Sequence, residues 1–267
     1  MTLYIISASI KISVYECIMK KKILYILFSL LFINLSSLSV SAEANFTYST
    51  PQNYNFQPRN NNDGSPEKIL FIVDFSNSMN ERLGYRTKLD IALSTMKETL
   101  SLIPPNTHVG LRVYGHKTGF TPKQSCSASE LISPIQSGNT VNIYTKLSSI
   151  NAVGWTPITF SLKQAAFFDF TDTTSKKRII LISDGGENCD ESPCDFVIDL
   201  MKYRDDIRVD VIALAVGDQD ANNQLKCVAL VTSGKFYNAN TAAELKNSLQ
   251  DSLNLQKEVQ GVIINQE

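Results

Sequence analysis

The chain has 267 residues, with 25 basic and 26 acidic side chains, and hydrophobic residues make up 43% of it. This balance excludes the strongly basic surface that a nucleic-acid-binding or anionic-membrane-binding protein needs. The length and the apolar content suit one α/β domain with a complete core.

Residues 19–42 have the three-part layout of a secretory signal peptide. Three lysines are followed by the apolar stretch Ile23–Ile33 and by a small-residue cleavage site that ends at Ala42. The apolar stretch is about half of the ~20 residues that a membrane-spanning helix needs, which favours cleavage over an uncleaved anchor. Cleavage after Ala42 leaves 225 residues with 21 basic and 25 acidic side chains. We therefore expect an exported protein, periplasmic or secreted, with no transmembrane segment in its mature chain.

Other segments flank the predicted domain. Residues 1–18 precede the basic start of the signal peptide, and we expect translation to begin at Met19, so that 1–18 is an extension the cell does not make. Residues 43–67 are rich in Asn, Pro, Ser and Tyr and have no periodicity, which predicts a flexible linker. The domain is expected over residues 68–255, followed by a C-terminal tail at 256–267.

Apolar strands alternate with amphipathic helices from Lys68 onward. Continuous apolar runs at 69–73 and 178–183, and a nearly continuous run at 209–216, are typical of strands that are buried on both faces. Alternating residues at 109–113 predict another strand, and Phe236-Tyr237 a short last one. The alternation with helices predicts a single α/β domain with a doubly wound, mostly parallel sheet flanked by helices.

The predicted helices carry clear start and stop signals. Apolar residues from Leu89 to Ile103 recur at steps of three and four and end before a Pro-Pro pair, which predicts an amphipathic helix. The other signals are a capping hydroxyl before a proline at Thr156 and at Ser192, a helix at 225–233 that Gly234 closes, and a capping box that begins at Thr241.

Polar oxygen donors follow two of the predicted strands. Asp74, Ser76 and Ser78 come directly after the first strand, Asp184 ends a later one, and Thr156 begins the helix before it. Ligands of doubly wound sheets bind beyond the carboxyl ends of the strands, where the strand order reverses. If the two strands are neighbours, two carboxylates and three hydroxyls converge there. Such oxygen donors suit Mg²⁺, Mn²⁺ or Ca²⁺ rather than zinc or copper.

Three short motifs carry a resemblance to a known family. D-F-S-N-S-M at 74–79 resembles the D-x-S-x-S motif of the von Willebrand factor type A domain, while G-W-T-P-I-T at 154–159 and L-I-S-D-G-G-E-N-C at 181–189 resemble its threonine and aspartate loops. The resemblance spans Lys68 to about Leu255. It implies a metal-ion-dependent adhesion site that holds a divalent cation, Mg²⁺ before Mn²⁺ or Ca²⁺, through Asp74, Ser76, Ser78, Thr156 and Asp184.

Other stretches of the sequence resemble one subgroup of this family more closely. L-R-V-Y-G-H, C-D-E-S-P-C and L-K-C-V-A-L-V-T-S-G-K-F-Y-N-A are similar to a bacterial exported subgroup related to calcium-activated chloride channel proteins. The family usually has glycine where this chain has Asn77 and Trp155. Ion conduction is not expected, because the mature chain has no predicted membrane-spanning segment.

The mature chain is expected to contain four cysteines, which are Cys126, Cys189, Cys194 and Cys227. An even number in an exported chain predicts two disulfides rather than a zinc site, since no C-x-x-C pair occurs. Side-by-side helices would bring Cys194 near Cys227 and leave Cys126 with Cys189. A local Cys189–Cys194 bridge is equally allowed by the spacing. Either bridge would brace the metal loops, by ~2–4 kcal/mol each.

The predicted oxygen donors lack an adjacent nucleophile and base, so we expect a binding domain and not an enzyme. The cation would bridge the protein to an acidic side chain of a protein partner. One alternative is an Mg²⁺-dependent phosphatase or hydrolase with Asp74 as nucleophile, but Ser76 stands where such enzymes need a second acid, and no G-x-S-x-G motif occurs. Another is an assembly subunit of an envelope complex. Glu187 and Asp190 are interpreted as solvated loop charges, and His116 as a structural residue.

Overall fold

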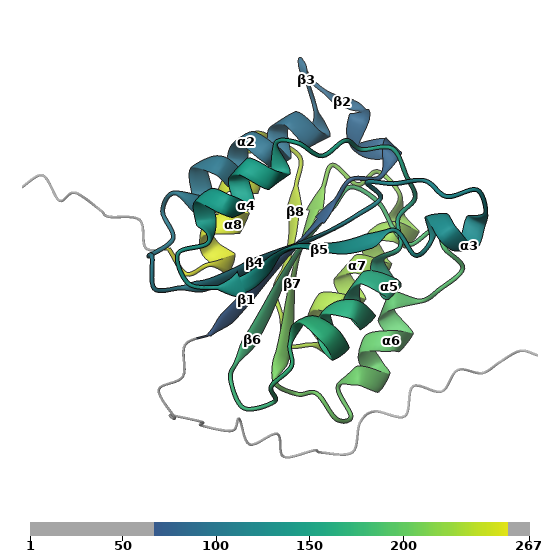
Figure 1. The fold of residues 1–267 in the computed structure, drawn as a ribbon. Coiled ribbons are helices and arrows are strands. Elements are labelled where there is room, and N and C mark those ends of the chain that lie inside the picture. The colour runs from purple at the N-terminus through teal and green to yellow at the C-terminus, as the bar shows by residue number, and fades with distance from the viewer. Residues whose placement is uncertain (1–66, 256–267) are drawn as a thin grey trace, which may run out of the picture. The chain divides into compact units, whose positions relative to one another are not determined.

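The computed structural model describes residues 67–255, in which helices cover both faces of one sheet (Figure 1). The sheet has the strand order β5-β4-β1-β6-β7-β8. Its strands are β1 (Lys68–Asp74), β4 (His108–Tyr114), β5 (Ser129–Gln136), β6 (Lys177–Ser183), β7 (Ile207–Leu214) and β8 (Phe236–Ala239). All neighbouring strands of this sheet pair in parallel except β4 and β5, which are antiparallel. The predicted fold class is therefore confirmed.

Strand β1 is the point where the strand order reverses. The chain runs from β1 to β4 and β5 on one side, and it later crosses to β6, β7 and β8 on the other. Because β1 and β6 are parallel neighbours, Asp74 at the end of β1 and Asp184 just after β6 lie at the same edge of the sheet. The two strands are therefore neighbours, as convergence of the predicted oxygen donors requires.

Two apolar cores lie on opposite faces of the sheet. Ile69, Phe71 and Val73 of β1 face one core, and Leu70 and Ile72 face the other. This double burial explains why the strand is a continuous apolar run. The first core is covered by α2 (Lys88–Leu100), α4 (Thr140–Leu147) and α8 (Ala242–Ser252), and the second by α5 (Ile158–Gln164), α6 (Pro193–Leu200) and α7 (Gln219–Val231) (Figure 1).

Short elements fill the connections between the long ones. A single turn of 3₁₀ helix, η1 (Asn77–Asn80), follows β1 and leads into a small hairpin of β2 (Arg82–Leu83) and β3 (Arg86–Thr87). The other short elements are α3 (Pro122–Ser125) and a π-helical turn, η2 (Ala165–Asp169). The sequence analysis predicted none of these, nor β5 and α4, because β5 is a half-exposed edge strand with a proline and α4 has no side-chain cap.

Three predicted helix boundaries are wrong in detail. Helix α2 ends at Leu100, three residues before the expected end, and Ile103 is buried in the turn that follows. Helix α7 starts earlier than residue 225, because Asp218 caps its first turn through two backbone N–H groups, and it ends at Val231, two residues before the expected end. The residue at positive φ after α7 is Ser233 and not Gly234. Gly234 is needed for another reason, since a Cβ there would lie 2.0 Å from the carbonyl oxygen of Val209.

The helix caps were predicted with mixed success. Ser192 caps α6 with Pro193 at its first position, and Thr241 caps α8 through the Glu244 N–H, as predicted. Thr156 does not cap α5, because Pro157 occupies the N-cap position and makes no side-chain capping hydrogen bond. Thr156 is therefore free for another role.

The predicted extension 1–18, signal peptide 19–42, linker up to residue 66 and tail 256–267 lie outside the described residues. Between residues 67 and 255, none of the helices combines the length and the apolar character that crossing a membrane requires.

Candidate metal-binding site

Three loops meet at the carboxyl end of the sheet. They are the loop after β1, the loop after β4, and the loop between α4 and α5. The backbone N–H of Phe75 donates to the Tyr114 carbonyl at 2.8 Å, and that of Asn77 donates to the Gly154 carbonyl at 2.9 Å. Gly115 has φ of +73°, and a Cβ there would lie 2.5 Å from the nitrogen of Ser76. Only glycine fits this position, because both its backbone conformation and the close approach of its neighbours exclude a side chain.

The side chains of Ser76 and Ser78 after β1 and of Asp184 after β6 form one hydrogen-bonded chain. The hydroxyl oxygens of Ser76 and Ser78 lie 3.0 Å apart, and the Ser78 hydroxyl donates to Oδ1 of Asp184 at 2.7 Å. Between these serines, Asn77 points to solvent, while Phe75 is buried in the core. Asn77 is not among the described residues at positive φ, so the turn does not need the glycine that the family usually has there.

Asp74 is fully buried and held at both carboxylate oxygens. Its Oδ1 accepts the backbone N–H of Ser76 at 2.6 Å, and its Oδ2 accepts the Ser183 hydroxyl at 2.7 Å. The Tyr114 hydroxyl lies 3.0 Å from the same Oδ2. Burial raises the pKa of Asp74 to about 6, and the nearby charge of Asp184 adds to this rise. A carboxylate in this position is costly to ionise unless a cation compensates it.

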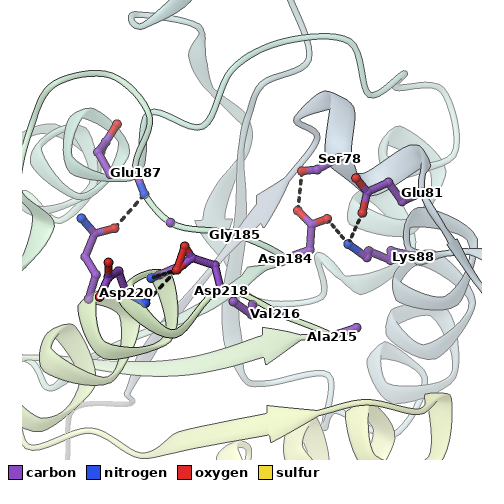
Figure 2. Close-up of a pocket in the computed structure, with 14 residues that line it drawn as sticks. Ser78, Glu81, Lys88, Asp184, Gly185, Glu187, Ala215, Val216, Asp218 and Asp220 are labelled. Atoms are coloured by element: carbon purple, nitrogen blue, oxygen red, sulfur yellow. Dashed lines mark hydrogen bonds and ion pairs between the residues drawn. The ribbon is translucent and has the colours of Figure 1, made fainter.

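Asp184 is also buried, but a lysine compensates its charge. The Lys88 ammonium lies 2.9 Å from Oδ2 of Asp184 and 2.7 Å from Oε2 of Glu81 (Figure 2). Burial lowers the pKa of Lys88, but the hydrogen bonds to Glu81 and Asp184 outweigh it, and the net shift is upward. Asp184 therefore presents Oδ1 toward the serines and Oδ2 toward Lys88.

Thr156 joins the site through its backbone. The nearby Gly154 forms an isolated parallel bridge with Ser76, and the Thr156 N–H donates to Oδ1 of Asn188 at 2.7 Å. Among residues 67–255, no hydrogen bond links the Thr156 hydroxyl to the other four predicted donors. The structure thus connects Ser76, Ser78 and Asp184 through side chains, holds Asp74 to them through the Ser76 backbone N–H, and places Thr156 on the adjoining loop.

Glu187 is a fixed part of the loop after β6. Its carboxylate accepts the backbone N–H of Thr159 at 2.7 Å and that of Cys189 at 3.1 Å, and its own N–H donates to Gln224 at 2.7 Å. Burial raises the pKa of Glu187, although the hydrogen bonds with Thr159 and Cys189 oppose this shift. The interpretation of Glu187 as a solvated loop charge is therefore wrong, whereas Asp190 is exposed as expected.

Two disulfides brace this end of the sheet. Cys126 is bonded to Cys189 and Cys194 to Cys227, with Cα–Cα distances of 5.5 and 5.6 Å. This is the pairing expected from side-by-side helices, and the local Cys189–Cys194 alternative is wrong. The first bridge ties the loop after β6 to the end of α3, and the second ties α6 to α7.

A hollow of about 590 Å³ adjoins the donors on the β7 side (Figure 2). Its wall includes the residues Ser78 and Asp184, the Lys88–Glu81 pair, and the acidic residues Glu187, Asp218 and Asp220. Two of the five candidate donors therefore belong to residues that border a space which a group from outside the protein can enter.

The donor set fits a hard divalent cation. Two oxygens bound at right angles to Mg²⁺ lie ~3 Å apart, because each metal–oxygen distance is ~2.1 Å. The Ser76–Ser78 and Ser78–Asp184 oxygen distances of 3.0 and 2.7 Å agree with this spacing. Within residues 67–255, no three His, Cys, Asp or Glu side chains gather in a way that would hold a metal. Any cation at this site therefore depends on hydroxyl oxygens as well as the two carboxylates.

Sequence reasoning missed several residues that hold these donors. Tyr114 is paired in register with Asp74 across β1 and β4, and Ser183 directly precedes Asp184, so strand pairing would have pointed to both. Lys88 carried a different signal, since it is a cation at the first position of a helix, where the helix dipole disfavours positive charge. Asn188 and Gln224 gave no sequence signal, because their partners are distant along the chain.

The comparisons with known proteins identify the family. The family model for the von Willebrand factor type A domain matches residues 68–251. The uncharacterized proteins YwmC and YwmD of Bacillus subtilis are each 30% identical to this chain. The YwmC match covers 72% of this chain and 86% of YwmC, and the YwmD match covers 67% and 82%. The chain belongs to the von Willebrand factor type A family.

Solved structures have the same fold. Proximal thread matrix protein 1 of the mussel byssus, in a structure with a zinc-occupied metal-ion-dependent adhesion site, matches with a TM-score of 0.55 at 17% identity. The match covers 72% of this chain and 46% of the mussel protein. The pilus adhesin SpaC of Lactobacillus rhamnosus GG matches with a TM-score of 0.57 at 17% identity, over 71% of this chain and 30% of SpaC. At these identities the matches show the fold alone.

Proposed function

We propose that this chain is an exported binding protein that recognises an acidic group on a protein partner through a divalent cation. Asp74, Ser76, Ser78, Thr156 and Asp184 would hold the cation, with Mg²⁺ as the expected ion. When bound, the cation supplies a Lewis-acidic position for a carboxylate oxygen. The observation that carries the proposal is the spacing of Ser76, Ser78 and Asp184, whose oxygens lie as far apart as cation ligands do, with Asp74 held beside them by the Ser76 backbone N–H.

The geometry around Asp74 favours binding over catalysis. A nucleophilic carboxylate needs one oxygen that can approach a substrate, whereas both oxygens of Asp74 accept hydrogen bonds from the protein and the residue is fully buried. Ser76, which stands two residues later, cannot act as a general acid near neutral pH. These features support a non-enzymatic role.

The related proteins and the disulfides support the remaining parts of the proposal. The mussel relative by fold holds zinc at its metal-ion-dependent adhesion site, and SpaC is a pilus adhesin. Two disulfides are typical of proteins that work in an oxidising compartment outside the cytoplasm. An exported protein that binds another protein at the cell envelope agrees with both observations.

The test compares cation binding and partner capture. Isothermal titration with Mg²⁺ and with Mn²⁺ should show one site in the wild type, and none in a Ser76→Ala/Ser78→Ala variant. A Ser149→Ala variant, which removes an exposed hydroxyl away from the site, serves as the control. Immobilised wild type should retain an envelope protein in Mg²⁺ and release it in EDTA, while the double variant should retain none. If the envelope protein is retained in EDTA as well as in Mg²⁺, and by the double variant as well as by the wild type, the proposed function is contradicted.

A further inference from the structure

Lys88 connects the candidate cation site to the start of α2. Its ammonium lies 2.9 Å from Oδ2 of Asp184 and 2.7 Å from Oε2 of Glu81 (Figure 2). The Lys88 side chain is 9% exposed and that of Asp184 is 0% exposed, whereas Glu81 is 66% exposed. The pair with Asp184 is thus shielded from solvent, and the pair with Glu81 is not.

A lysine at this place is not explained by helix stability. Lys88 is the first residue of α2, where the exposed N–H groups create a partial positive charge that disfavours a cation. Thr87 and Asp90 already form a complete capping box there, so Lys88 is not needed to begin the helix. Two carboxylates hold the Lys88 ammonium, and the buried one belongs to Asp184, a predicted cation ligand.

The two carboxylate oxygens of Asp184 have different partners, and this arrangement determines how the charge of Lys88 affects a bound cation. Oδ1 faces the Ser78 hydroxyl at 2.7 Å, and Oδ2 faces Lys88. One carboxylate oxygen therefore remains on the cation side, while a fixed positive charge lies directly behind it. Solvent screens the charge of Glu81 far more than it screens the buried pair. A divalent cation would then meet two carboxylates and one buried ammonium, and these four groups together would keep a net positive charge. Asp218 and Asp220 in the wall of the hollow are exposed, so solvent screens their charges as it screens that of Glu81.

We propose that Lys88 is a specificity-determining residue. It lowers the affinity of the site for its cation, and it leaves the loaded site with more positive charge to attract an acidic ligand. The inference rests on the proposed function and deepens it. Without Lys88, the two carboxylates would neutralise the cation, and the attraction for an incoming carboxylate would fall. Lys88 therefore weakens the binding of the cation and strengthens the binding of the acidic ligand.

Cation affinity is the first test. Isothermal titration with Mn²⁺ alone should show a dissociation constant about tenfold lower for Lys88→Met than for the wild type, since removing a buried positive charge near a divalent ion removes strong repulsion. Lys97→Met is the matched control, because it removes the same charge from the exposed side of the same helix and should leave the constant unchanged. A purely structural role for Lys88 predicts weaker binding, so unchanged or weaker binding in a folded Lys88→Met protein overturns the inference.

The second test measures the acidic ligand with acetate as the probe. Bound Mn²⁺ broadens the proton resonance of acetate that binds at the cation, and the Mn²⁺-saturated wild type should broaden it several-fold more than saturated Lys88→Met. Tetramethylammonium, which has no carboxylate, should be broadened equally little by both proteins. Equal broadening of acetate by both proteins overturns the part of the inference that concerns the acidic ligand.

Two further results keep the tests decisive. If Lys88→Met does not fold, Lys88→Gln replaces it, because glutamine keeps a hydrogen-bond donor toward Asp184 without the charge, and the same gain in Mn²⁺ affinity is expected. Failure of the wild type to bind Mn²⁺ contradicts the proposed function itself. Binding by the wild type without a change in the Lys88 variants contradicts only the role of Lys88.

Discussion

At the scale of single residues, the burial of Asp74 should make stability depend on pH and, under the proposed function, on cations. The pKa of Asp74 is raised from 3.8 to about 6, first by burial and then by Asp184. The folded protein therefore keeps a proton on this group that the unfolded chain has already released. Between these two values, stability falls as the pH rises, because the fold must carry a buried charge that the unfolded chain exposes to water.

We therefore expect a pH effect that depends on Asp74. In EDTA, the wild type should lose about 2–3 kcal/mol of unfolding free energy relative to Asp74→Asn between pH 4 and pH 7, as the buried carboxylate ionises. Saturating Mg²⁺ should restore stability at pH 7 in the wild type and not in the variant. Urea unfolding followed by circular dichroism at several pH values measures both effects. A difference between the two proteins that does not change with pH would contradict the assignment of this charge.

Asn188 is not a predicted cation ligand, but it should contribute to cation affinity by positioning the loop that carries Thr156. Its Oδ1 accepts the N–H of Thr156 at 2.7 Å and so fixes the loop that carries the Thr156 hydroxyl. Asn188→Ala removes one hydrogen bond worth ~1 kcal/mol, and the Mn²⁺ dissociation constant should rise about fivefold. Asn223→Ala, at an exposed position of α7, is the control. Titration calorimetry gives both dissociation constants, and equal values for the two variants would mean that Asn188 does not contribute to cation binding.

At the scale of elements, the strands that carry the carboxylates were predictable, whereas the contacts between the loops were not. β1 and β6 are continuous apolar runs because each feeds two cores, so their ends, and hence Asp74 and Asp184, could be located from the sequence. Tyr114, Lys88 and Asn188 reach the site only through strand pairing and loop packing, and their own sequence neighbourhoods do not indicate this. Edge strand β5 escaped notice because it is half exposed and interrupted by a proline.

Gly115 shows how closely the loops after β1 and β4 approach each other. We expect Gly115→Ala to cost at least ~2 kcal/mol more than Gly84→Ala, because both have positive φ but only Gly115 is crowded. A Cβ at Gly115 would lie 2.5 Å from Ser76 N and 2.7 Å from the Trp155 carbonyl oxygen, whereas one at Gly84 meets nothing within 4 Å. Urea denaturation of both variants measures the difference. Equal losses would mean that the loops separate at little cost.

At the scale of the whole molecule, the two ends of the sheet have different tasks. At the amino end of the strands, the fully buried Lys177 ammonium is paired with Asp172 at 3.0 Å and with Asp206 at 2.8 Å, which satisfies its charge within the fold. At the carboxyl end, Asp74 has no such lysine, and its compensation is left to hydrogen bonds and, in the proposed function, to a cation. The buried charge at the amino end is thus satisfied within the fold, whereas the proposed function assigns cation binding to the carboxyl end.

The two disulfides lie at the carboxyl end of the sheet, where the proposed site lies, and they allow the effects of stability and of cation binding to be separated. They close loops with sequence separations of 63 and 33 residues, and the chain-entropy relation gives each of them about 4 kcal/mol. Removing either pair should therefore lower stability by a similar amount. The consequences for the site should differ, because Cys189 is next to Asn188, which holds Thr156, whereas Cys194 and Cys227 join two helices.

We accordingly expect Cys126→Ser/Cys189→Ser to weaken Mn²⁺ binding several-fold, and Cys194→Ser/Cys227→Ser to leave it within about twofold of the wild type. Titration calorimetry at a temperature where both double variants are folded measures the constants, and thermal unfolding confirms that their stabilities are comparable. Equal weakening in both variants would show that cation affinity follows global stability and does not depend on the local anchoring of the loop after β6. Loss confined to the first variant would show that the bridge between Cys126 and Cys189 maintains the position of Asn188, and through it that of Thr156.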